Sequence, residues 1–165
     1  MPITKVLPFV TLGAVFTLMF IGGYVSASGV GLTCPKWPLC PAGFVPMDEF
    51  LIEYFHRSVA ATTALLVFVT MFFALKSKIA PRTMKIASVI ASCAAIGQIS
   101  LGAIVIIERL HAILVTVHLG LGLLLFSMVL ITVVYSRRIM DSNKQIKETS
   151  LEKSSFSSSR NTSTA

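Results

Sequence analysis

Charged residues are scarce in this sequence. Only 13% of its 165 residues are charged, whereas 55% are hydrophobic. The mean hydropathy is +0.83. A water-soluble domain has an apolar content of roughly 45–50%. The composition therefore excludes a soluble globular domain and indicates a chain that lies mostly within a lipid bilayer.

Four hydrophobic stretches are long enough to cross a bilayer, whose core of roughly 30 Å requires about 20 apolar residues in a helix. They cover residues 6–27, 50–75, 84–107 and 110–135. They predict an all-α membrane protein, a four-transmembrane-helix bundle formed by one domain, residues 1–135. The first stretch also has features of a secretory signal, but its length of about 20 residues exceeds the usual 7–15 and favours a retained helix.

Two polar segments remain outside these stretches. Residues 28–49 form a loop rich in Gly, Pro and Cys between the first two stretches. Residues 136–165 are rich in serine with mixed charge and have almost no large apolar groups. Such a segment cannot offset its ordering entropy by burial, so we expect a disordered cytoplasmic tail.

The basic residues predict how the bundle lies in the membrane. They gather in the connection between the second and third stretches and after the fourth: Lys76, Lys78, Arg82, Lys85, Arg137 and Arg138. Because cytoplasmic loops carry an excess of Lys and Arg, both termini are expected inside and the loop at 28–49 outside. The formal charge of +7 is largely this bias plus the tail. It therefore implies no nucleic-acid partner.

Two of the three cysteines, Cys34 and Cys40, lie in the predicted external loop. An oxidising compartment lets a disulfide persist, and their spacing permits a small ring, so we expect a disulfide bond that is either structural or redox-active. A zinc site is poorly supported because the loop has no histidine or further cysteine. A Cys-x-x-Cys motif is also lacking, which weakens a thiol oxidoreductase without excluding it. The third cysteine, Cys93, is expected to be a small buried hydrophobic residue.

Four ionisable residues fall inside the predicted helices: Glu53, His56, Arg57 and His118. Such residues are costly in a bilayer, so each is a functional hypothesis. At 1.5 Å per residue, His56 lies about 9 Å and His118 about 12 Å from the outer end of its helix. Two neutral histidines at matching depth in a four-helix bundle are a usual means of axially ligating a haem iron. A zinc or di-iron site would be less well supplied with ligands.

Other polar residues surround this pair in the sequence. Glu53 precedes His56 by one helical turn and shares its face, where it could act as an acid or base beside a bound ligand; an ion pair with Arg57 at i, i+4 is compatible with that role. His111 is expected to be an interfacial histidine. Gln98 is a buried polar group that must find a hydrogen bond, and it could simply tie two helices together.

Several motifs resemble those of the haem A synthase family. They are IGGYV at 21–25, SGVGLTCPKWPLC at 28–40, IEYFHR at 52–57, QISLGA at 98–103 and HLG at 118–120. The resemblance extends over about residues 8–135. A Cys-Pro-x-Trp-Pro-Leu-Cys loop followed by Glu-x-x-His-Arg is a demanding combination.

The resemblance implies an oxidoreductase of haem biosynthesis that serves cytochrome oxidase assembly. Enzymes of this family oxidise the C8 methyl group of haem O to the formyl group of haem A by successive hydroxylation, with haem b as a cofactor. Carried over to this sequence, the resemblance makes His56 and His118 axial ligands of a haem iron and Glu53 the catalytic carboxylate. Arg57 would pair with a haem propionate or with Glu53.

The resemblance makes Cys34 and Cys40 the external redox-sensitive pair. It also implies partners. The usual form of the family has eight helices in two related halves, whereas this sequence resembles one half. Either two copies associate, or a different half supplies the second histidine pair, or this half binds haem without synthesis. Of these we expect a homodimer or higher homo-oligomer in the cell membrane. Haem O synthase and a quinone or other electron acceptor are further expected partners.

Two functions of other classes remain open. The histidine pair alone fits a bis-histidine cytochrome b that carries electrons. The chain could instead be a membrane thiol oxidoreductase or assembly factor that uses Cys34 and Cys40.

Overall fold

The structure, a computed structural model, describes residues 3–32 and 51–162. Cys34 and Cys40 lie outside the described residues. The elements are α1 (Ile3–Ala27), the short 3-10 helix η1 (Val30–Leu32), α2 (Leu51–Lys76), α3 (Arg82–Ile107) and α4 (Ala112–Thr162). Four of these helices are long and apolar enough to cross a membrane. The predicted all-α membrane fold is therefore confirmed.

The helices end where the backbone leaves the helical region. Gly29, just after α1, has a φ of 74°, a conformation that glycine adopts without steric cost. Pro81 precedes α3 in extended conformation. Arg109 and Leu110, between α3 and α4, have φ values of 49° and 60°. These two left-handed residues turn the chain within a few residues, so α3 and α4 run antiparallel as close neighbours.

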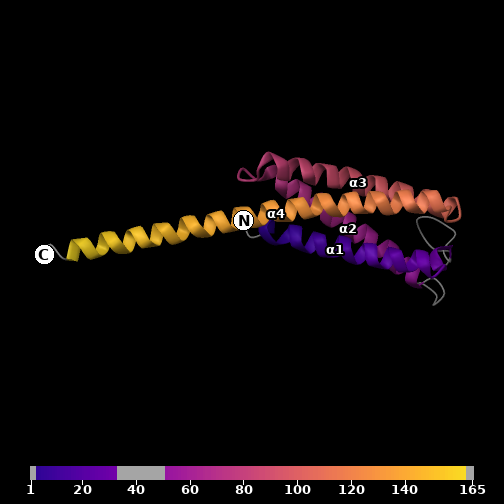
Figure 1. Cartoon of the computed structure of the whole chain (residues 1–165), viewed down its shortest axis with the longest axis horizontal. Helices are drawn as coiled ribbons and strands as arrows, with labels where there is room; N and C mark the ends of the chain where they lie inside the picture. The colour runs from indigo at the N-terminus through magenta and orange to yellow at the C-terminus, as the bar shows by residue number, and fades with distance from the viewer. Residues whose placement is uncertain (1–2, 33–50, 163–165) are drawn as a thin grey trace.

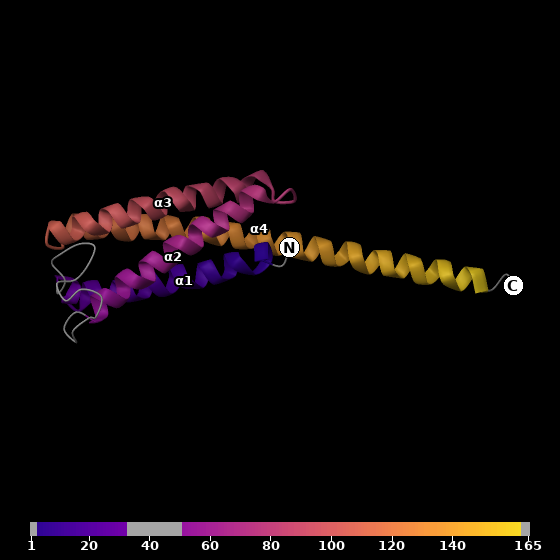
Figure 2. The ribbon, with the colours of Figure 1, turned by 180° about the vertical axis from the view of Figure 1, so that it is seen from behind.

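Each helix packs chiefly on two neighbours: α1 on α2 and α4, and α3 on α2 and α4. The bundle is thus a square in which α2 and α4 occupy opposite corners, as the two opposed views agree (Figures 1 and 2). The main core lies halfway along the bundle and consists of small and branched side chains: Val15, Val67, Ala91, Ala94, Ala95, Leu125 and Val129. Small residues on α3 let α4 approach closely, which is how membrane helices gain packing contacts.

A hydrogen bond between threonines joins α1 to α2. The hydroxyl oxygens of Thr11 and Thr70 lie 2.8 Å apart. Both side chains are buried, Thr11 completely. Large hydrophobic side chains such as Phe16 and Phe20 point outward instead and are more than half exposed. This inverted distribution of polar and apolar groups suits a bundle that is surrounded by lipid rather than by water.

The structure describes α4 as one helix to Thr162, whereas the sequence predicts a disordered tail from residue 136. Figure 1 shows this helix projecting far beyond the other three. The physical reason is that the sequence after Gly122 contains no glycine or proline that would break it. Lys144 and Glu148 also form an i, i+4 pair at 3.8 Å, which supports a solvated helix.

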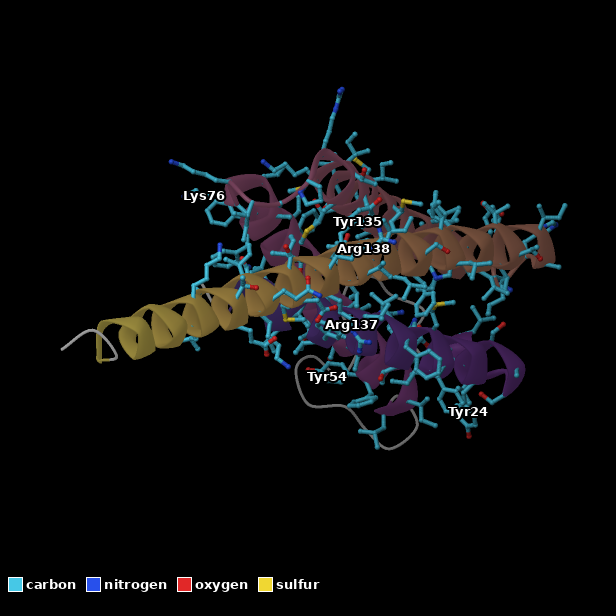
Figure 3. All side chains as sticks on the ribbon, turned by 60° about the vertical axis from the view of Figure 1, so that its left-hand side comes forward. Tyr24, Tyr54, Lys76, Tyr135, Arg137 and Arg138 are labelled. Carbon is cyan, nitrogen blue, oxygen red and sulfur yellow. The ribbon has the colours of Figure 1, made fainter. Side chains whose placement is uncertain are left out.

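The start of α1 and the α2–α3 connection lie at one end of the bundle, from which α4 projects, and the α3–α4 turn lies at the other end (Figure 1). Three cations near the first end lie over aromatic rings (Figure 3). The pairs are Lys76 with Phe72 at 4.5 Å, Arg137 with Phe9 at 5.0 Å and Arg138 with Tyr135 at 5.3 Å. The basic residues on which the predicted orientation depends are therefore gathered at this end, and the orientation itself stays a prediction.

Candidate paired-histidine site

His56 and His118 lie near the end of the bundle that is opposite the termini. His56 comes five residues after the start of α2 and His118 six residues after the start of α4, which places them about 7.5 and 9 Å along their helices. Both side chains are half-buried. The sequence prediction of matching depth therefore agrees with the structure, which adds that the two helices stand at opposite corners of the bundle.

A glycine of a neighbouring helix packs against each imidazole. A Cβ atom placed on Gly22 of α1 would lie 3.1 Å from Cε1 of His56. A Cβ atom on Gly102 of α3 would lie 3.5 Å from Cε1 of His118. The rings thus contact backbone where any other residue would place a side chain. Both glycines belong to motifs quoted above, but sequence patterns assign them no role, because only the packing of helices distant in sequence reveals these contacts.

The two helical hairpins present their glycine and histidine in the same way. Gly22 and Gly102 each precede the last residue of their helix, Ala27 or Ile107, by five positions. His56 and His118 each follow the start of the next helix by five or six positions. The hairpin α1–α2 and the hairpin α3–α4 therefore repeat one arrangement on the two sides of the bundle axis.

An ion pair within α2 accompanies His56. The Glu53 Oε1 and Arg57 Nη2 atoms lie 2.5 Å apart, with side chains 3% and 15% exposed. This is the i, i+4 pair that the sequence indicated. The corresponding positions around His118 are Val115 and Leu119, so the charged pair distinguishes the first hairpin from the second.

Gln98 of α3 joins α4 at the second histidine. Its Nε2 donates a hydrogen bond of 2.9 Å to the backbone carbonyl oxygen of His118. The expected hydrogen bond between two helices is thus present, and its acceptor is the backbone of His118, a candidate iron ligand.

The remaining candidates lie apart from this cluster. His111 is exposed and directly precedes α4, in keeping with an interfacial residue. Cys93 is exposed on the outer face of α3, so the expectation that it is buried is wrong. At this position α3 faces away from the other helices, on the side where a bundle in a bilayer contacts lipid.

The residues at the site fit a haem. Among the described residues, the buried Nδ1 atoms of His56 and His118 have no hydrogen-bond partner. Two imidazoles on opposite helices would supply the two nitrogen donors that a bis-histidine haem takes, whereas a structural zinc site takes four ligands. Glycine at positions 22 and 102 lets each imidazole pack directly against the backbone of the neighbouring helix.

Fold and site together define a class: a polytopic four-helix membrane protein with a paired-histidine site suited to haem. Comparison with known sequences is more specific. A profile of the COX15-CtaA family, described as cytochrome oxidase assembly protein, matches residues 45–158. The chain therefore belongs to this family, and it is a multi-pass membrane protein of the cell membrane.

Individual relatives agree with that assignment. The heme A synthase of Bacillus licheniformis is 30% identical over 130 residues, which cover 77% of this chain and 43% of the relative. The heme A synthase of an Exiguobacterium species is 32% identical over 130 residues, covering 74% and 42%. The heme A synthase of Shewanella oneidensis is 29% identical over 157 residues, covering 81% and 47%. The chain spans less than half the length of these curated relatives, and the resemblance to haem A synthases drawn from its motifs is confirmed.

Proposed function

We propose that this chain acts as a haem A synthase-type oxidoreductase, which converts the C8 methyl group of haem O to the formyl group of haem A for cytochrome oxidase assembly. The observation that supports the proposal is the pair of imidazoles on opposite helices with a buried carboxylate one turn from His56. The proposed enzyme lies in the cell membrane with both termini in the cytoplasm, the orientation favoured by its basic residues.

His56 and His118 would hold the haem iron through their imidazole nitrogens, and Gly22 and Gly102 let the two imidazoles pack against helix backbone. When bound, the haem iron supplies the oxidising centre. Conversion of a methyl to a formyl group takes one oxygen atom from water and releases four protons and four electrons. An acceptor such as a quinone must therefore receive the electrons, with haem b as the cofactor on the way.

Glu53 is suited to receive protons from the reacting methyl carbon or from water. It is buried, so it is screened from bulk solvent, and it lies on the same helical face as His56. The guanidinium of Arg57 forms an ion pair with Glu53, and a guanidinium also suits a carboxylate such as a haem propionate. Both proposed roles thus fall to residues within one turn of α2.

A homo-oligomer would supply what one copy lacks. Two copies contain two histidine pairs, one for the substrate haem O and one for the cofactor haem b, as the two halves of a longer relative would. A two-fold dimer is the simplest closed assembly. Haem O synthase is the expected source of substrate. The external pair Cys34 and Cys40, outside the described residues, is proposed as a redox-sensitive disulfide.

The test is to purify the protein from a host that makes haem O, extract the haem in acidic solvent and separate haems B, O and A by chromatography. A His56→Ala variant serves as the control. Haem O with hydroxylated or formyl products, all lost in the control, is the expected result. Haem B alone would support a bis-histidine cytochrome b that carries electrons, which the same histidine pair also fits.

A different outcome would favour the thiol chemistry. If no haem is extracted and a Cys34→Ser, Cys40→Ser variant loses function in oxidase assembly, the chain is a thiol oxidoreductase or assembly factor instead.

A further inference from the structure

A close contact between α3 and α4 lies directly beside His118. Gln98 donates through Nε2 to the His118 carbonyl oxygen at 2.9 Å. A Cβ atom on Gly122 would lie only 2.6 Å from that same Nε2 atom. A Cβ atom on Gly97 would lie 3.0 Å from Cδ2 of Leu121. The amide of Gln98 therefore occupies space that exists only because residue 122 is glycine.

The bond adds to the regular helical pattern of α4. In an α-helix the carbonyl of His118 accepts the N–H of residue 122, and its second lone pair remains available. Gln98 uses that lone pair from another helix. Because the backbone dihedrals vary little within a regular helix, holding this carbonyl also restrains the rotation of α4 at His118. The ring itself meets the backbone of α3 at Gly102, so α3 restrains both the main chain and the imidazole.

The cost of burying this amide argues for a specific role. Among the described residues, the buried Oε1 atom of Gln98 has no hydrogen-bond partner. A leucine of similar volume would avoid burying an unsatisfied carbonyl. The corresponding positions in the first hairpin are indeed apolar: Leu18, four residues before Gly22, and Ala60, four residues after His56. The amide restraint thus belongs to one histidine.

We propose that Gln98 is a positioning residue for His118 and that glycine is required at position 122 to admit its amide. Gln98 sets the plane of the His118 imidazole through the backbone without touching the ligand. This inference rests on the proposed function, in which His118 ligates a haem iron.

The test compares three variants with one control. Gln98→Leu removes the donor at similar volume, Gln98→Asn keeps an amide but shortens its reach by one methylene, and Gly122→Ala expels the amide without changing it. Gly120→Ala is the matched control on the same helix, because a Cβ there would meet no described atom within 4 Å.

Two measurements report on orientation. In haem-free protein, the ¹³C resonance of a selectively labelled His118 carbonyl responds to loss of the hydrogen bond. In haem-loaded protein, the largest g-value of the ferric low-spin electron paramagnetic resonance spectrum responds to the angle between the ligand planes. We expect all three variants to move both signals in the same direction and Gly120→Ala to move neither.

A double substitution sharpens the test. Gln98→Ala creates the room that a methyl group at position 122 needs, so adding Gly122→Ala to Gln98→Ala should produce no further shift in either signal. Additive shifts, or wild-type signals in Gly122→Ala, would overturn the positioning role.

The outcome also separates this inference from the proposed function. If His118→Ala retains haem at the wild-type level, the ligand assignment and hence the proposed function are wrong. If His118→Ala loses haem while the Gln98 variants keep wild-type signals, only the positioning role is wrong.

Discussion

The carboxylate of Glu53 and the guanidinium of Arg57, one helical turn apart on α2, form a largely buried ion pair. His56 lies between them in the sequence. An isolated charge at this depth in a membrane would be costly. Each member of the pair therefore compensates the other, and substitutions at the two positions should act differently on stability and on chemistry.

Glu53→Gln should retain haem and abolish product. Glutamine preserves the shape of the side chain and leaves both histidines in place, but an amide does not accept the proton that a carboxylate takes. The measurement is the amount of bound haem by absorbance and of haem A by chromatography. Glu108→Gln, an exposed carboxylate at the end of α3, is the control. Normal haem A in Glu53→Gln would show that the catalytic assignment is wrong.

Arg57→Met should destabilise the bundle by roughly 3 kcal/mol, because it removes the cation beside a buried carboxylate. The further change Glu53→Gln should recover most of this loss, since the remaining buried charge is then removed. Thermal unfolding in detergent measures both effects. If the double variant is as unstable as Arg57→Met alone, the ion pair is not the source of the effect.

Gly22→Ala should disturb the site more than Gly102→Ala. The added methyl group would lie 3.1 Å from the His56 ring in the first case and 3.5 Å from the His118 ring in the second. The first separation is tighter than ordinary van der Waals contact, so the ring must move by a few tenths of an ångström, whereas the second is tolerated. Haem content and the position of the Soret band are the measurements.

The matched control for both glycines is Gly23→Ala, where a Cβ would meet no described atom within 4 Å. Equal effects of the substitutions at positions 22 and 23 would argue against a contact with the imidazole.

Thr11→Val should weaken the bundle by about 0.6 kcal/mol and by no more than about 1.7 kcal/mol, the range of hydrogen bonds between membrane helices. The substitution preserves shape and removes the hydroxyl that lies 2.8 Å from that of Thr70. Thr17→Val, an exposed threonine of α1, should have no effect. Reversible unfolding in mixed micelles measures the difference, and a larger loss in Thr17→Val would contradict the role of this bond.

Truncation after Met140 should leave the thermal midpoint of the bundle unchanged. The described side chains of residues 141–146 are exposed, so their removal deletes helix without deleting packing. Far-ultraviolet circular dichroism should show a loss of helical signal before heating. A lowered midpoint would mean that the projecting part of α4 stabilises the bundle.

Much of this architecture could be predicted from the sequence, because apolar length alone determines which segments cross a membrane. The stretches at 6–27, 50–75 and 84–107 differ by at most three residues from Ile3–Ala27, Leu51–Lys76 and Arg82–Ile107. The last helix extends to Thr162, beyond the predicted boundary at 135, because nothing in the serine-rich segment terminates a helix.

The site was predictable only in part. Depth and helical spacing are local properties, so they brought together His56 with His118 and Glu53 with Arg57. The glycines beside the imidazoles depend on how α1 approaches α2 and how α3 approaches α4. The fit of Gln98 to Gly122 depends on the second of these approaches, and the sequence shows neither. The roles of all these residues in haem chemistry stay predictions.

The repeated hairpins bear on ligand orientation. A planar ligand rotated by half a turn about the long axis of the bundle would contact the same imidazoles and the same glycines. Ligation alone therefore cannot distinguish the two faces or edges of the ligand. The orientation of the ligand would then be set by features that the hairpins do not share. These are the ion pair of Glu53 and Arg57 on one side and the amide of Gln98 on the other. On the proposed function, regioselectivity would thus depend on where the two hairpins differ and not on the two histidines.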